Sequence, residues 1–172
     1  MNATHLRDLY EQKRLALRRH PSLARSTAHA KVRLTAGLCC EVQHGERITL
    51  ADLPAGEGGG ASAAGPGDLM RASLGACLAI GYRSWAARFG IELASVEVDV
   101  TVEYDARGQL GLSDDVAIGW QRLRFDVRVA SDATDAEVRR VVEHADRLSP
   151  MLANLSPAIA RVHTLSVQRP QH

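Results

Sequence analysis

The 172-residue chain contains few cysteines, few aromatic residues and no excess of either charge. Its three cysteines, an odd number, argue against the disulfide framework of a small secreted domain. With 21 basic and 20 acidic residues, it lacks the positive charge that nucleic-acid binding requires. Aromatic residues make up only 4% of the chain, so a core must consist mainly of Val, Leu, Ile and Ala.

Signals for membranes, metals and nucleotides are also absent. No run of about 18 apolar residues is present, and the N-terminus lacks the apolar stretch of a secretory signal. We therefore expect a cytoplasmic protein. The seven histidines never approach a His-X-X-X-His spacing and there is no Cys-X-X-Cys, so no metal is expected. The glycines at 58–60 and 65–67 fit neither a phosphate-binding loop nor a dinucleotide fingerprint, so no cofactor is expected either.

The first 29 residues are predicted to form an N-terminal helical extension, and residues 30–172 the main domain. Leucines recur at helical spacing over residues 3–19, and Pro21 ends that helix. The basic run at 13–19 is interpreted as the solvated face of the helix. Three short strands should follow between Lys31 and Leu50, with turns at Gly37 and at His44-Gly45, as an antiparallel meander.

Residues 54–67 consist almost wholly of Gly, Ala, Ser and Pro. They fit a linker and a mobile lid equally well. A long helix should then begin at Pro66, with Asp68 in its positive first turn, and end at Gly90. Because this helix is rich in apolar and small residues, we expect it to be buried in the centre of the fold.

The second half of the chain predicts two alternating strands, over 96–104 and 123–129, and a last strand over 162–167. Between them, Thr134 and Glu137 have the spacing of a helix-initiating capping box. This order of elements indicates an α+β fold with helices packed on antiparallel sheets.

Cys77, near the middle of the long helix, is the candidate nucleophile of the chain. A buried cysteine is often only a small apolar residue of the core, and the helical pattern alone favours that interpretation. However, Ser73 and Ser84 share its helix face, so this face could line a pocket. Cys39 and Cys40 are adjacent on a strand and point to opposite sides, which favours packing roles.

Ser149, followed by Pro150, has the pattern of a helix N-cap, and nothing more is needed to explain it. A thiol at such a position would have its thiolate favoured. The hydroxyl present here stays neutral, but it can donate a hydrogen bond to a substrate.

The helix sequence resembles a known family. The segment that begins at Gly65-Pro66-Gly67-Asp68 and ends at Leu74-Gly75-Ala76-Cys77 is similar to the OsmC-type signature, Pro-x-Glu-Leu-Leu-Leu-x-x-Leu-Gly-x-Cys. Phe89-Gly90-Ile91, the long alternating strand and the helix break at Ser149-Pro150 match the same layout. The resemblance to the OsmC/Ohr family covers roughly residues 30–168.

This resemblance implies an intertwined homodimer with a long buried central helix and sites at the subunit interface. It also implies reduction of organic hydroperoxides by a peroxidatic cysteine, which Cys77 matches. Asp68 stands where the signature has Glu, and Ser149 stands where the family has its resolving cysteine. Arg33 and Arg47 are the candidates for the family's activating arginine.

Two functions follow from the resemblance. The first is a one-cysteine thiol peroxidase, whose oxidised Cys77 is reduced by an external thiol, or by Cys39 or Cys40 if the fold brings one near. The second is a non-catalytic OsmC-like dimer that binds a small apolar ligand. The missing second cysteine, the lack of an assigned arginine and the shorter acid at Asp68 motivate the second function.

Overall fold

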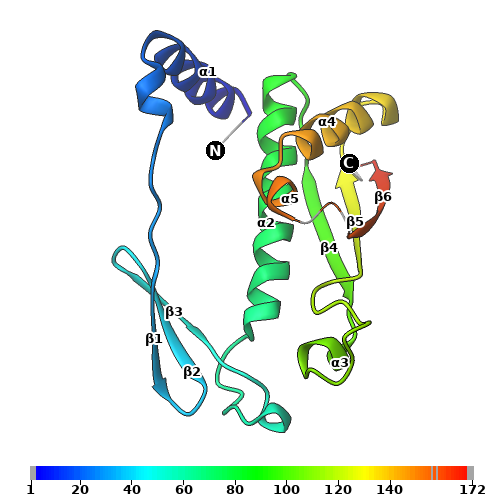
Figure 1. Cartoon of the computed structure of the whole chain (residues 1–172). Helices are drawn as coiled ribbons and strands as arrows, with labels where there is room; N and C mark the ends of the chain where they lie inside the picture. The colour runs from blue at the N-terminus through cyan, green and yellow to red at the C-terminus, as the bar shows by residue number, and fades with distance from the viewer. Residues whose placement is uncertain (1–2, 156, 158, 170–172) are drawn as a thin grey trace. The chain divides into compact units, whose positions relative to one another are not determined.

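The computed structural model describes residues 3–155, 157 and 159–169. The chain folds as a mixed α+β protein with two three-stranded sheets (Figure 1). It divides into two compact units. One comprises residues 13–72, and the other combines the start of the chain up to residue 12 with residues 73 onward. The predicted boundary at residues 29 and 30 remains a prediction.

The N-terminal helix and the first sheet agree with the sequence analysis. Helix α1 (Ala3–Arg19) is followed by a 3-10 turn (Pro21–Ala24). Strands β1 (Lys31–Ala36), β2 (Cys39–His44) and β3 (Arg47–Ala51) pair as an antiparallel meander. The turns contain Gly37 and Gly45 with φ of 57° and 61°, a conformation that glycine adopts without steric cost. The predicted meander is therefore confirmed.

The glycine-rich segment is folded around one carboxylate. Asp52 is only 2% exposed, and its side chain accepts hydrogen bonds from the backbone N–H groups of Leu53, Gly60 and Ser62 at 2.8, 3.1 and 3.0 Å. The Ser62 hydroxyl donates a fourth, at 2.7 Å. These bonds lower the pKa of Asp52, and those from Ser62 contribute most. The segment is thus an ordered loop that contains a short 3-10 turn (Ala55–Glu57).

Helix α2 (Pro66–Arg88) ends as predicted. The N–H of Ile91 donates to the carbonyl of Ala86 at 2.9 Å, and that of Gly90 to Ala87 at 3.2 Å. With Gly90 at a φ of 73°, this is a Schellman cap. At the same end, the Arg88 guanidinium lies between the rings of Tyr10 and Trp85, 3.3 and 3.7 Å from their centroids.

The helix is buried on one face rather than all round. Its buried residues recur at helical spacing and are Leu74, Leu78, Tyr82, Ala86 and Ala87. Ile80, on another face, is 67% exposed. Burial on every side, as expected from the sequence, is not seen within this single chain. No helix among the described residues is long and apolar enough to cross a membrane.

The second sheet differs from the predicted antiparallel arrangement at one pair. Strands β4 (Ser95–Glu103) and β5 (Arg122–Ala130) are antiparallel, but β5 and β6 (Ala160–Gln168) are parallel. The reason is the connection through α4 (Asp135–Arg147) and α5 (Pro150–Asn154), which returns the chain to the same end of the sheet. The turn expected at Arg107-Gly108 after β4 is present as the single-turn helix α3 (Ala106–Gln109), which was not predicted as a helix.

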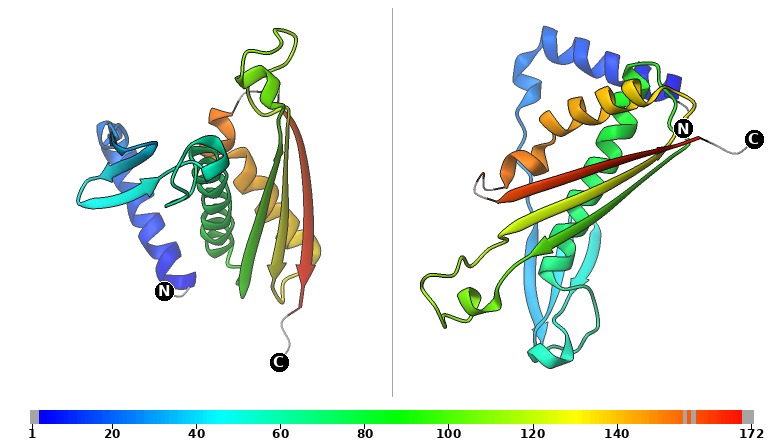
Figure 2. Two further views of the ribbon diagram at one scale, coloured as in Figure 1. Left: turned by 90° about the horizontal axis from the view of Figure 1, so that it is seen from below. Right: turned by 90° about the vertical axis from the view of Figure 1, so that its right-hand side faces the viewer.

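One face of the second sheet packs into the hydrophobic core, and the other face carries charged side chains. The core residues of β5 pack with residues of α2 and α4, which lie on the same side of the sheet (Figure 2). They are Leu123, Phe125, Val127 and Val129 from β5, and Val138, Val141, Val142 and Ala145 from α4. On the other face, Arg128 pairs with Glu97 at 2.8 Å and with Asp99. The alternation of apolar and polar residues in the sequence thus predicted the core-facing side of this sheet correctly.

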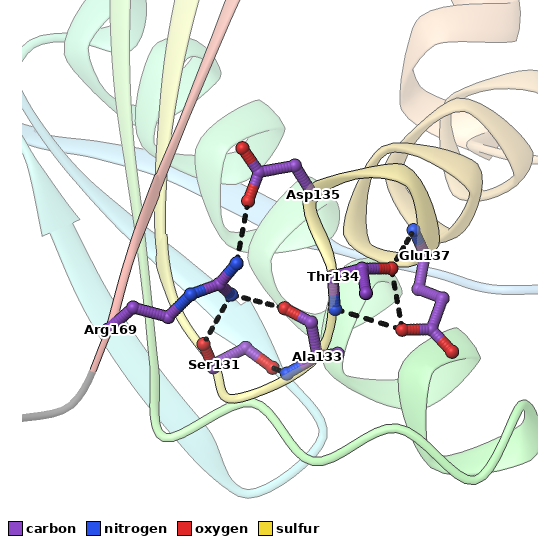
Figure 3. A network of polar contacts seen from close by, with 6 residues as sticks. All are labelled: Ser131, Ala133, Thr134, Asp135, Glu137 and Arg169. Carbon is purple, nitrogen blue, oxygen red and sulfur yellow. Dashed lines mark hydrogen bonds and ion pairs between the residues drawn. The ribbon is translucent and has the colours of Figure 1, made fainter.

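A polar network fixes the corner between β5 and α4 (Figure 3). The predicted capping box is present, with Glu137 N–H donating to Thr134 Oγ1 at 3.3 Å and Thr134 N–H donating to Glu137 Oε2 at 2.9 Å. Arg169, just after β6, donates to the carbonyls of Ser131 and Ala133 and pairs with Asp135. The start of α4 is therefore stabilised both by its own capping box and by Arg169.

Candidate active site

Cys77 lies in the middle of α2 and is half-buried. Two residues earlier on α2, Gly75 faces β4. A Cβ at Gly75 would lie 3.4 Å from Val100 Cγ2. The Cys77 side chain itself is partly open to solvent.

Ser149 is a polar partner of Cys77. The two atoms Cys77 Sγ and Ser149 Oγ lie 3.8 Å apart, within hydrogen-bond range for sulfur. Ser149 is 7% exposed and caps α5, because its Oγ accepts the N–H of Leu152 at 3.3 Å. Since that bond uses a lone pair, the single hydroxyl proton remains able to point at the sulfur. The structure therefore brings together two of the three predicted catalytic residues.

Tyr82, five residues after Cys77 on α2, and His163 both contact Asp146, an arrangement that was not predicted from the sequence. Tyr82 Oη donates to Asp146 Oδ1 at 2.7 Å, and His163 Nδ1 lies 3.2 Å from Asp146 Oδ2. Burial, above all, raises the pKa of Tyr82, and the charge of Asp146 and a Cys77 thiolate raise it further. Tyr82 therefore remains a hydrogen-bond donor at any physiological pH. No local motif marks these residues, which come from three separate elements.

The predicted pocket serines have different surroundings. Ser73 is exposed, and its Oγ lies 4.0 Å from Met151 Sδ in α5. Ser73 and Cys77, one turn apart, therefore both face the segment that carries Ser149. Ser84 is half-buried, and no described contact links it to Cys77. A pocket-lining role for either serine remains a prediction.

Asp68 is engaged at the start of α2. Its Oδ2 accepts the N–H of Gly65 at 2.9 Å and its other oxygen pairs with Arg71. This places Asp68 at the third helical position, reaching back to the N-cap backbone, which is a structural role. It belongs to the compact unit of residues 13–72, and its part in any chemistry of Cys77 remains a prediction.

The two candidate arginines and the other two cysteines lie in that same unit. Arg33 pairs with Glu41 across β1 and β2 at 2.5 Å, and Arg47 begins β3. Cys39 Sγ lies 3.7 Å from Ser62 Oγ, and all three cysteines are free thiols. Among the described residues, no cluster of His, Cys, Asp and Glu could hold a metal ion.

Comparison with known proteins identifies the family to which this fold and this helix cysteine belong. The family model described as OsmC-like protein matches residues 58–162, more than half of the chain. The protein belongs to the OsmC-like family. A sequence search of curated proteins found no match.

Solved structures agree with this assignment at the level of the fold. An OsmC-like protein from Mycoplasma pneumoniae superposes with a TM-score of 0.69 at 15% identity, over 82% of this chain and 98% of that one. An organic hydroperoxide resistance protein OsmC from Legionella pneumophila gives a TM-score of 0.63 at 20% identity, over 83% and 98%. An organic hydroperoxide resistance protein from Elizabethkingia anophelis, with thiocyanate bound, gives 0.65 at 19% identity, over 84% and 98%.

Proposed function

We propose that the protein is a thiol-dependent organic hydroperoxide reductase that works with Cys77 as its single peroxidatic cysteine. The observation that supports this most directly is the Cys77–Ser149 contact at 3.8 Å, on the helix whose sequence matches the family signature. A hydroxyl that donates to sulfur stabilises the thiolate, which is the reacting form. The names of similar structures as organic hydroperoxide resistance proteins support the substrate class.

The proposed reaction has two halves. The Cys77 thiolate attacks the outer oxygen of the hydroperoxide, the O–O bond breaks, and the alkoxide takes up a proton and leaves as an alcohol. The product on the protein is a sulfenic acid. Because position 149 is a serine, an external thiol condenses with the sulfenic acid and releases water. A second external thiol then reduces the mixed disulfide and restores Cys77.

A single-turnover reaction tests this proposal. Reduced protein is mixed with one equivalent of cumene hydroperoxide, and Cys77 is trapped with a sulfenic-acid reagent and identified by mass spectrometry. We expect labelling at Cys77 and release of one cumyl alcohol per chain. Cys77→Ser should abolish both, while Cys39→Ser and Cys40→Ser serve as matched controls that retain them. An unmodified Cys77 under excess hydroperoxide would contradict the proposal.

We also propose that the protein works as a homodimer. Several large apolar side chains of the first sheet are exposed in the single chain, among them Val32 (59%), Leu34 (60%) and Ile48 (64%). Ile80 of α2 is exposed as well, and such surfaces are typical of subunit interfaces. Analytical ultracentrifugation should give twice the chain mass, and Ile80→Glu should shift the equilibrium toward monomer. A wild-type monomer at micromolar concentration would refute this.

The alternative is a non-catalytic dimer that binds a small apolar ligand. It is favoured by the engagement of Asp68 with Arg71 and of Arg33 with Glu41, because these pairs occupy the groups expected to activate the thiol. The pH dependence of Cys77 alkylation separates the two functions. A half-point near the ordinary thiol value of about 8.5 or above favours the ligand-binding function, and a markedly lower one favours the peroxidase.

A further inference from the structure

Three side chains, from α2, α4 and β6, meet at Asp146, three residues before Ser149. Tyr82 is fully buried and donates to one oxygen of Asp146, while His163 contacts the other oxygen. The carboxylate is itself mostly shielded, with 18% of its side chain exposed. A hydrogen bond between a buried phenol and a shielded carboxylate is stronger than its counterpart at the surface. Both oxygens of Asp146 thus have a partner.

This contact lies directly next to the segment that carries Ser149. Asp146 is in the last turn of α4, and its backbone carbonyl accepts the N–H of Ser149 at 3.2 Å. Tyr82 follows Cys77 by five residues on α2. The Tyr82–Asp146 bond therefore links the helix that holds the thiol to the bend that holds the hydroxyl.

Strand β6 holds the same bend at a second point. Arg161, two residues before His163 and on the same side of the strand, donates to the carbonyls of Leu152 and Leu155 at 3.2 and 3.5 Å. The His163 ring is itself fixed, because it stacks on Phe125 with the centroids 4.6 Å apart. Residues from β6 therefore fix the chain on both sides of Ser149.

We propose that Tyr82, Asp146 and His163 are positioning residues that hold the Ser149 side chain against Cys77. None of the three touches the reacting atoms. They act through the α4–α5 bend, whose orientation relative to α2 decides whether Ser149 can reach the sulfur. The proposal deepens the proposed function, since it takes Cys77 as the reacting thiol.

The geometry can be measured without hydroperoxide by converting Ser149 to a thiol. In a Ser149→Cys reference protein that also carries Cys39→Ser and Cys40→Ser, the introduced thiol and Cys77 are equilibrated with oxidised and reduced glutathione. Two protein thiols and one oxidised glutathione give one intramolecular disulfide and two reduced glutathiones, so the equilibrium yields an effective concentration. This quantity reports how well the two positions are held together in the folded protein.

We expect Tyr82→Phe and His163→Ala each to lower that effective concentration about tenfold, the factor associated with the loss of one charge-assisted hydrogen bond. His163→Asn should restore most of it, because its amide nitrogen can donate to Asp146 in place of Nδ1. Tyr104→Phe and His44→Ala are the matched controls, since both residues are exposed and outside the contact. Each control should leave the value unchanged.

Effective concentrations within about twofold of the reference in both Tyr82→Phe and His163→Ala would overturn the proposal. If Tyr82→Phe fails to fold, the comparison of His163→Ala with His163→Asn decides, and equal values for these two would overturn it as well. The proposed function is tested independently of the positioning residues. A wild-type Cys77 that is inert to cumene hydroperoxide, together with the expected graded loss in the engineered series, would uphold the positioning network and reject the peroxidase.

Discussion

Cys77 and Ser149 lie 72 positions apart in the sequence, and their side chains meet with Sγ 3.8 Å from Oγ. The single side-chain oxygen of Ser149 takes part in two interactions. It caps α5 by accepting the N–H of Leu152, and its proton is available to the sulfur. A cysteine at position 149 could resolve an oxidised Cys77, whereas a serine can only stabilise it. The expected effects of changing Ser149 follow from these two interactions, the cap of α5 and the contact with Cys77.

Ser149→Ala should cost stability more than chemistry. Removing the cap of α5 should lower the free energy of unfolding by about 1 kcal/mol, the usual cost of such a loss. Turnover of Cys77 should fall by less than about tenfold, because only one hydrogen bond to the thiolate is lost. Urea unfolding and single-turnover peroxidation measure the two effects. Ser73→Ala is the matched control, and a loss of turnover as large as that of Cys77→Ser would contradict the prediction.

Thr134→Ala should destabilise the start of α4. The change removes the acceptor for Glu137 N–H and should cost about 1 kcal/mol of stability. Thr134→Ser keeps the hydroxyl and should retain most of the stability. Thermal unfolding monitored by circular dichroism compares the two. Equal losses in both variants would show that the methyl group, and not the cap, is responsible.

Gly59→Ala should open the glycine-rich loop. A Cβ at Gly59 would lie 2.0 Å from the carbonyl oxygen of Leu53, a distance that requires the backbone to move. The same carbonyl accepts the N–H of Ala61 at 3.0 Å, so that amide should exchange faster with solvent. Gly56→Ala, with nothing within 4 Å of its added carbon, should leave exchange unchanged. Slow exchange at Ala61 in Gly59→Ala would refute the prediction.

The loop around Asp52 should loosen in acid. Hydrogen bonds to the carboxylate, above all those from Ser62, lower its pKa below its ordinary value in the folded state, so ionised Asp52 stabilises the fold. That stability is fully present above the unfolded-state pKa and is lost as the pH falls through the folded-state pKa. Hydrogen exchange of the Gly60 and Ser62 amides between pH 5 and pH 2 should show the change. Asp52→Asn should exchange rapidly throughout, and an unchanged profile in that variant would contradict the assignment.

Local signals in the sequence predicted most of the elements. The turns at Gly37 and Gly45, the start of α2 at Pro66 and its end at Gly90 were all correct, because each depends on the residues immediately around it. The capping box of α4 was correct for the same reason. The pairing of Cys77 with Ser149 agreed with the family resemblance, which assigned related roles to the two positions.

Long-range relationships were not predictable in this way. The parallel pairing of β6 depends on the path of α4 and α5, and a strand pattern does not reveal its direction. The carboxylate of Asp146 was not singled out, because its partners Tyr82 and His163 come from distant parts of the chain. The ordered loop around Asp52 was left open between linker and lid, since composition alone does not show which backbone donors converge on a carboxylate.

The parallel pairing of β6 also has a consequence for the order of folding. Strands β4 and β5 can pair once the segment between them, which contains α3, has been made, but β6 can dock only after the chain has crossed over through α4 and α5. Ser149 lies within that crossover, and Arg161 and His163, which hold it, lie on β6 itself. During synthesis the thiol of Cys77 therefore emerges long before its partner hydroxyl is in place. Until its last strand has folded, the nascent chain carries Cys77 without the fixed Ser149 contact.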